Sequence, residues 1–327
     1  MTDPVLRVKN LTTHFFTRAG VVKAVDGVSF DLAKGEILGL VGESGSGKTV
    51  AGFSLLGLVD APGRIVEGSV KLNGVELTTL SEAELRSRRG REISMIFQDP
   101  IATLNPMLTI GQQMKLAIDA HEQMSPRAAE TRSTELLTQV GIPSASARLR
   151  AYPHEFSGGM RQRVAIAIAL LHHPAVIVAD EPTTALDVSI QAQILSQMRN
   201  LAQQTGTAMI WISHDLAVVS SLASKLAVMY AGRIVEQGQT ATLLRDPRHP
   251  YTAGLIASLP AMTKPGTPLT QIPGTTPSLL SLPPGCPFAP RCDRATDRCG
   301  SEPDMTVQDS RGWRCFHPVG QSDTVRA

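Results

Sequence analysis

The segment GESGSGKT has the residue types and the spacing of a phosphate-binding loop. It follows a short apolar run and precedes a segment whose apolar residues recur at helical spacing, which is the strand–helix context such a loop requires. Glycines let backbone N–H groups converge on an anion, and a helix N-terminus adds partial positive charge. We expect Lys48 to reach the β- and γ-phosphates of a nucleotide and the Thr49 hydroxyl to bind magnesium. Since a chance match has odds of roughly one in a hundred, the loop predicts a nucleotide site.

Polar side chains follow three further apolar runs. Gln98 ends EISMIFQ, Asp180 and Glu181 end AVIVADE, and His214 follows TAMIWIS. Because ligands bind beyond the carboxyl ends of parallel strands, we expect these residues to share an edge with the loop.

Each of these side chains suits one step of phosphate chemistry. Asp180 suits magnesium, because hard cations prefer oxygen ligands. Glu181 suits a general base that polarises the attacking water. Gln98 can orient water or complete the magnesium shell, and His214 can hydrogen-bond the γ-phosphate. Taken singly, a residue of this kind is usually an ordinary loop residue, but their joint appearance after such strands favours function.

A second anion-binding helix start is predicted at Ser157, Gly158 and Gly159, which precede a run with apolar residues every three or four positions. Alone, this feature would be an ordinary serine N-cap. One nucleotide cannot occupy two separate phosphate cradles in one chain, so the pattern predicts two chains packed head to tail with shared sites.

The elements that must position these residues belong to a globular chain. Its 327 residues suffice for one large domain and a smaller one. The net charge of +2 argues against a nucleic-acid partner, which needs a dense basic face. The sequence contains no run of about 18 apolar residues, so no membrane span is predicted. The start MTDPVLRVKN lacks the pattern of a signal peptide. We therefore expect a cytosolic protein with reduced thiols.

The end of the chain differs in composition. Nine of the 22 prolines fall between Pro260 and Pro290, so this stretch is not expected to build much of a core unless something fastens it. All four cysteines follow at spacings C-x5-C, C-x6-C and C-x15-C. Thiolates that bind a metal centre would fasten such a region. From the residues alone, an iron–sulfur cluster, a zinc ion that His317 helps to bind, and free thiols all stay open.

The motifs GESGSGKT, QDP, SGGMRQR, VIVADEPTTALD and ISHD occur in the order and spacing of the ATP-binding cassette (ABC) family, which the chain resembles over most of residues 1–240. The resemblance implies a nucleotide-sandwich dimer, in which Ser157–Gly159 of one chain close on ATP bound to the partner. It also implies that Ala185, Leu186 and Asp187 form a loop communicating between the two sites. Met160 departs from the family, which usually has glutamine there.

The resemblance implies that Phe15 stacks on adenine, with Phe16 as the competing candidate. The other positions it assigns to ATP are Gly42, Glu43, Ser44, Gly45, Ser46, Gly47, Lys48, Thr49, Gln98, Ser157, Gly158, Gly159, Asp180 and Asp187. The resemblance assigns catalysis to Glu181, His214 and Gln98. It assigns Mg²⁺ binding to Thr49, Gln98 and Asp180.

The implied fold is α/β: a P-loop NTPase core of the RecA-like type with an antiparallel β subdomain, an inserted helical subdomain and a small irregular C-terminal extension. The nucleotide-binding domain would cover residues 1–262, with the helical subdomain at about 99–165, and the extension residues 263–327. Serine-capped helices are expected from Ser81 and Ser125. The helical subdomain is where such proteins contact a membrane subunit.

The segments HPYTAGLIASLP, IPGTTPSLL, CPFAPRC and CFHP resemble the C-terminal extension of ATPases in dipeptide and oligopeptide importers, over roughly the last 80 residues. This resemblance implies a 4Fe-4S cluster with a structural role, with Zn²⁺ as the alternative centre. The implied ligands are Cys286, Cys292, Cys299 and Cys315.

The function that follows from the resemblance is the ATP-hydrolysing motor of a dipeptide or oligopeptide importer. Its expected partners are two transmembrane permease subunits, a second ABC ATPase (a different chain favoured over an identical one) and, indirectly, an extracytoplasmic substrate-binding protein. It would bind peripherally at the cytoplasmic face of the inner membrane.

Three alternative functions compete with this one. One is an importer of nickel or another small solute. Another is an ABC ATPase of DNA repair, but the long coiled-coil or zinc-finger insertions and basic surfaces of that class are not found here. A third, a generic phosphate-loop switch or kinase, leaves Ser157–Gly159 and His214 unexplained.

Overall fold

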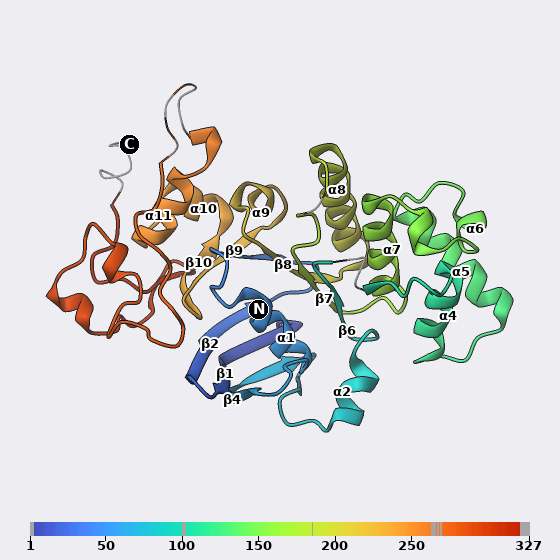
Figure 1. Ribbon diagram of the computed structural model, residues 1–327, viewed down its shortest axis with the longest axis horizontal. Helices are drawn as coiled ribbons and strands as arrows, with labels where there is room; N and C mark the ends of the chain where they lie inside the picture. The colour runs from blue at the N-terminus through green and yellow to red at the C-terminus, as the bar shows by residue number, and fades with distance from the viewer. Residues whose placement is uncertain are drawn as a thin grey trace. The chain divides into compact units, whose positions relative to one another are not determined.

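The computed structural model describes residues 3–99, 103–184, 186–262, 266, 268 and 270–320 (Figure 1). The chain divides into two compact units. The first unit comprises Met1–Val5, Ala33–Glu36 and Thr79–Ile210, and the second comprises Leu6–Leu32, Ile37–Thr78 and Trp211–Ala327.

The sheet strands of the first unit are β6 (Ile93–Ile96), β7 (Val176–Asp180) and the start of β8 (Ala208–Ser213), which continues into the second unit. β6 and β7 run parallel, with Ile93 opposite Val176 and each strand buried along its length. Continuous burial explains why these strands are unbroken apolar runs and do not alternate between apolar and polar residues.

Helices make up most of the described part of the first unit. The chain between β6 and β7 forms a group of helices that pack against one another: α4, α5, α6 and α7 (Figure 1, green). Ser81 and Thr109 each form a capping box, and Ser125 caps α5 with Pro126 in its first turn, so local side chains fix these helix starts. The helices are α2 (Glu82–Arg88), α4 (Ile110–Asp119), α5 (Pro126–Gln139), α6 (Ala145–Arg148), α7 (Gly158–Leu170) and α8 (Val188–Thr205), with the 3₁₀ turn η1 (Pro153–Glu155).

The second unit begins with an antiparallel sheet of strand order β2-β1-β4-β5. Leu6 lies opposite Leu32 and Thr17 opposite Gly20, so β1 and β2 form a long hairpin. Helix α1 (Lys48–Leu56) packs against β1 and β2. The strands are β1 (Leu6–Thr17), β2 (Gly20–Leu32), β4 (Gly63–Leu72) and β5 (Val75–Glu76).

The other strands of the second unit follow the order β11-β12-β10-β9-β3. β3 and β9 are parallel, and the remaining pairs are antiparallel. The bounds are β3 (Ile37–Val41), β9 (Lys225–Tyr230), β10 (Arg233–Gln239), β11 (Thr306–Gln308) and β12 (Arg311–Trp313), with helices α9 (Leu216–Leu222), α10 (Thr240–Arg245) and α11 (Pro250–Ala257) and 3₁₀ turns η2 (Pro260–Met262), η3 (Ala289–Arg291) and η4 (Asp297–Gly300).

The C-terminal extension is built into this sheet. Trp313 of β12 pairs with Glu236 of β10, and the Arg311 guanidinium bonds to the fully buried Glu236 carboxylate at 3.0 Å. The ring of Phe288 packs edge-on against Tyr230, with centroids 5.3 Å apart. Described residues of the C-terminal extension are therefore held to the second unit by strand pairing, aromatic packing and an ion pair.

In the parts of the chain that the structure describes, no helix combines the length and apolar character that crossing a bilayer requires.

Candidate functional site

The predicted phosphate-binding loop connects β3 to α1 in the second unit. Gly42, Gly45 and Gly47 all have positive φ angles, of 156°, 76° and 98°. A Cβ atom would lie 2.1 Å from the Met229 carbonyl oxygen at Gly42 and 2.0 Å from the Ala24 carbonyl oxygen at Gly47. Backbone conformation and close approach therefore both require glycine at these two positions.

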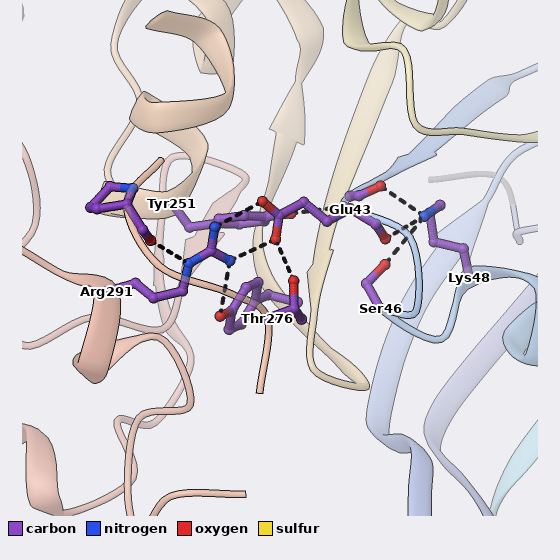
Figure 2. Close-up of polar contacts among 9 residues, drawn as sticks. Glu43, Ser46, Lys48, Tyr251, Thr276 and Arg291 are labelled. Atoms are coloured by element: carbon purple, nitrogen blue, oxygen red, sulfur yellow. Dashed lines mark hydrogen bonds and ion pairs between the residues drawn. The ribbon is translucent and has the colours of Figure 1, made fainter. Parts of the chain in front are cut away.

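Lys48 is folded into this loop, with only 6% of its surface exposed. Its ammonium donates to the Gly42 carbonyl at 2.7 Å, the Glu43 carbonyl at 2.9 Å and the Ser46 hydroxyl at 3.3 Å (Figure 2). Thr49 follows in the first turn of α1, and Ser44 is exposed. The arrangement concentrates positive charge where a helix begins, which suits an anion.

Glu43, in the same loop, is bonded to three residues that the sequence did not single out. Its carboxylate receives two bonds from Arg291 and one from Thr276, and its backbone N–H donates to the Tyr251 hydroxyl (Figure 2). The Arg291 hydrogen bond is the main cause that lowers the pKa of Glu43 below its ordinary value, although burial opposes the shift. No local pattern could have signalled these partners, because they lie more than 200 residues away in the chain.

The two aromatic candidates on β1 have different surroundings. Phe15 is partly buried, and its ring would be 2.6 Å from a Cβ atom at Gly63, so it packs against β4. Phe16 is 40% exposed, and the Arg64 guanidinium lies 4.3 Å from its ring centroid. The choice of Phe15 for adenine stays a prediction.

In the first unit, the structure brings Gln98 and Glu181 together. The Gln98 amide donates to the Glu181 carboxylate at 3.2 Å, and the Thr184 hydroxyl donates to the same oxygen at 3.0 Å. Asp180 ends β7 and is 2% exposed. Glu181 has a left-handed backbone with φ of 44°, an uncommon conformation for a residue other than glycine.

The predicted second anion site is an exposed helix start. Ser157 is the N-cap of α7, and its hydroxyl accepts the Met160 N–H at 3.3 Å. Ser157 and Gly158 are exposed, whereas a Cβ atom at Gly159 would lie 2.8 Å from Ile190. This helix end is therefore open to an incoming group.

The remaining predicted site residues lie at helix starts and strand ends. Asp187 is the N-cap of α8 and makes no side-chain capping bond there. Ala185, the first residue of the predicted communicating loop, lies outside the described residues. His214 is exposed and follows β8, immediately before Asp215, which caps α9.

The metal centre predicted at the four cysteines of the extension is wrong. Within the described ranges, no group of three or more His, Cys, Asp or Glu side chains has the geometry to hold a metal ion. The four cysteines line one cavity of about 10 Å³, the room that a single water needs. Neither the 4Fe-4S cluster nor the Zn²⁺ alternative is therefore supported.

The thiols behave as small apolar side chains. Burial raises the pKa values of Cys286, Cys292 and Cys315, the last to about 11, so these groups are protonated at neutral pH. The cluster was an expectation from the family resemblance, since the residues alone left free thiols open as well. Aromatic packing and ion pairs hold described residues of the extension in place.

Comparisons with known proteins give two family matches. The model of the family described as "ABC transporter" matches residues 25–184. The model described as "Oligopeptide/dipeptide transporter, C-terminal region" matches residues 235–299.

Curated relatives match nearly the whole chain. The oligopeptide transport ATP-binding protein AppD of Bacillus subtilis is 47% identical over 95% of this chain and 96% of its own length. The oligopeptide transport ATP-binding protein OppD of Escherichia coli is 47% identical over 97% of this chain and 94% of its own. The dipeptide transport ATP-binding protein DppD of B. subtilis is likewise 47% identical, over 96% and 95%.

Solved structures share the fold. The ATP-binding cassette MJ0796, in a dimeric post-hydrolysis state bound to ADP and Pi, superposes with a TM-score of 0.65 at 26% identity, over 72% of this chain and 98% of that one. The structure of cbiO1 from Clostridium perfringens superposes with a TM-score of 0.63 at 23% identity, over 74% of this chain and 91% of that one. This likeness shows the fold alone.

Proposed function

The chain belongs to the ABC transporter family, among the ATP-binding proteins of oligopeptide and dipeptide transport, and from this membership we propose how its residues do their work. It is the ATP-hydrolysing motor subunit of a peptide importer. The observation that carries this conclusion is the 47% identity over 95% of the chain, C-terminal region included. The predicted family, fold class, function and ATPase activity are thereby confirmed.

The proposed nucleotide site centres on residues 42–49. The loop amides and Lys48 bind the β- and γ-phosphates, and Phe15 stacks on adenine. Support comes from the left-handed glycines and from the ammonium already inside the loop. We assign Mg²⁺ to Thr49, Gln98 and Asp180, whose oxygen atoms are the donors it prefers and where it would neutralise phosphate charge.

For hydrolysis, we propose Glu181 as the general base. Gln98 orients the water through its bond to the Glu181 carboxylate, and His214 hydrogen-bonds the γ-phosphate. The 3.2 Å bond between Gln98 and Glu181 supports a joint role for these two side chains. A positioned general base accelerates such a step about 10²- to 10⁴-fold.

Family membership implies membrane permeases and an ATPase partner. We propose that the exposed start of α7, Ser157–Gly159, closes on ATP held by the partner ATPase, with Asp187 in the loop between the sites. In finer detail, the proposed assembly contains two permeases and a second, different ATPase. An extracytoplasmic binding protein delivers peptide, and the ATPases lie at the cytoplasmic face of the inner membrane.

We propose a division of labour along the chain, with a boundary at residue 262 that falls inside the second family match, residues 235–299. Residues 1–262 form the nucleotide-binding domain, in which residues 99–165 are the helical subdomain that meets the permeases. Residues 263–327 form the extension. Its likeness to the oligopeptide/dipeptide C-terminal region favours peptides over nickel or another small solute.

Glu181→Gln tests the catalytic assignment. We expect ATP binding to persist while turnover falls about 10²- to 10⁴-fold, because the amide cannot accept the proton of water. With its partner ATPase present, ATP should then trap the variant in a closed dimer, detected by size-exclusion chromatography with light scattering. Normal hydrolysis in this variant would place the base elsewhere.

Two controls accompany that variant. Glu130→Gln makes the same chemical change on the exposed face of α5 and should hydrolyse ATP normally. Lys48→Ala should lose nucleotide affinity itself, which separates a binding defect from a catalytic one.

A further inference from the structure

Glu43 in the phosphate-binding loop is held from two sides by three residues near the end of the chain, which we call the Glu43 clamp: Tyr251, Thr276 and Arg291. The Arg291 guanidinium donates to both carboxylate oxygens, at 2.7 and 3.0 Å, and the Thr276 hydroxyl donates at 2.9 Å (Figure 2). Tyr251 accepts the Glu43 backbone N–H at 2.8 Å. Both the side chain and the backbone of this loop residue are therefore fixed.

Arg291 is itself immobilised. Its side chain is 5% exposed, its Nε atom donates to the Pro273 carbonyl at 2.8 Å, and its NH1 atom donates to the Tyr230 hydroxyl at 3.3 Å. The guanidinium also lies 5.8 Å from the Tyr230 ring centroid and 5.9 Å from that of Phe288. A planar, bidentate donor held this way imposes a position as well as supplying a charge.

The position of Glu43 in turn sets the position of Lys48. The Glu43 carbonyl accepts both the Ser46 N–H, at 3.2 Å, and the Lys48 ammonium, at 2.9 Å. The same residue thus connects the clamp on one side to the turn of the loop and its cation on the other. A shift of Glu43 would move both.

We propose that Arg291 is a positioning residue for ATP, through which the C-terminal extension holds the phosphate-binding loop in its binding conformation. The inference rests on the proposed role of residues 42–49 in binding phosphate. It makes the extension a structural part of the nucleotide site, with Glu43 as the point of contact.

Loss of the clamp has a specific kinetic signature. An unclamped loop populates the binding conformation only part of the time, and the apparent affinity for ATP falls by that fraction. Saturating ATP restores the conformation, because the ligand selects it. KM should therefore rise while kcat stays near the wild-type value.

Arg291→Met and Arg291→Lys in the full-length chain test the proposal. The Kd is measured with a fluorescent ATP analogue, and KM and kcat with ATP. We expect Arg291→Met to weaken binding about tenfold, the range of one charged hydrogen bond, with kcat unchanged. Arg291→Lys keeps the charge but loses the bidentate fork. Its Kd should therefore lie between those of the wild type and Arg291→Met.

Arg311→Met is the matched control, since Arg311 is an equally buried arginine of the extension that pairs with Glu236 and Asp246 and not with the loop. It should lower the melting temperature but leave the Kd for ATP unchanged. An equal rise in Kd would overturn the proposal, because general loosening of the extension would then explain both variants.

A double variant keeps the proposal testable if Arg291→Met does not fold. When Glu43→Ala has already removed the side chain, Arg291→Lys should weaken ATP binding no further. Additive losses would show that Arg291 acts by another route.

Lys48→Ala distinguishes this proposal from the function on which it rests. Wild-type affinity in Lys48→Ala would reject residues 42–49 as the phosphate site. Lost affinity in Lys48→Ala together with normal affinity in Arg291→Met would reject the clamp alone.

Discussion

Glu43 illustrates how much a single residue of a familiar motif depends on its surroundings. Between Gly42 and Gly45 its side chain has no fixed task in the pattern, and the family resemblance assigns it only to the nucleotide. In the folded chain its carboxylate is the acceptor of a buried guanidinium. The fold therefore gives this loop residue contacts that the phosphate-binding motif does not predict.

The charge state of Glu43 gives a prediction about pH. Arg291 lowers the pKa of Glu43 below its ordinary value of 4.5, so the folded state holds this proton more weakly than the unfolded chain does. The clamp then stabilises the fold fully above the unfolded pKa and is lost as the pH falls through the folded pKa.

Glu43→Gln should flatten that dependence. The free energy of unfolding, measured in urea at about pH 7 and about pH 4, should decline less in the variant than in the wild type. An identical decline in both proteins would mean that the Glu43 carboxylate is not ion-paired in the fold.

At the level of elements, the predicted catalytic residues and the second anion site lie where a strand or helix begins or ends. Gln98 follows β6, Asp180 ends β7, His214 follows β8 and Ser157 caps α7. Element ends expose side chains and backbone donors that element interiors consume in hydrogen bonds. Polar residues directly after apolar runs are therefore informative in the sequence.

Ser157 has two separable tasks in our proposal, capping α7 and contacting ATP on the partner. Ser157→Ala should cost about 1 kcal/mol of stability, and Ser157→Gly only a few tenths, because glycine is tolerated at N-caps. Both variants lack the hydroxyl, so both should weaken ATP-dependent dimerisation equally.

Chemical denaturation and light scattering measure these two effects. If Ser157→Ala weakened dimerisation more than Ser157→Gly, in proportion to their losses of stability, the serine would act only as a helix cap.

At the scale of the whole molecule, the extension is part of the second unit's core. β12 extends the sheet beside β10, and Glu236 of β10 is fully buried with bonds from Arg311 and from the backbone N–H groups of Arg248 and His249. A carboxylate in such a place is tolerated only while its partners remain.

Arg311→Met should therefore destabilise the protein by about 3–5 kcal/mol, because it leaves the Glu236 charge unpaired in the interior. Replacing Glu236 with glutamine as well should recover part of that loss. Urea denaturation of the three proteins checks this, and a loss within about 0.5 kcal/mol would mean that the pair contributes little to the fold.

Features that depend on neighbours in the chain could be predicted from the amino-acid sequence. The glycines and Lys48 of the loop, the polar residues after buried strands and the serine caps are short-range patterns, since backbone conformation and helix or strand periodicity are set over a few residues. Local patterns therefore predicted the helix starts at Ser81 and Ser125, which the structure confirms, and suggested many of the candidate site residues.

The contacts made by the end of the chain, in contrast, emerge only in the folded protein. Counting prolines suggested a region without a core, and the cysteines then suggested a metal to fasten it. The fold instead brings Arg291 to Glu43, Arg311 to Glu236 and Phe288 to Tyr230. Contacts between residues so distant in the chain leave no spacing to recognise, because their geometry exists only once the sheet between them has formed.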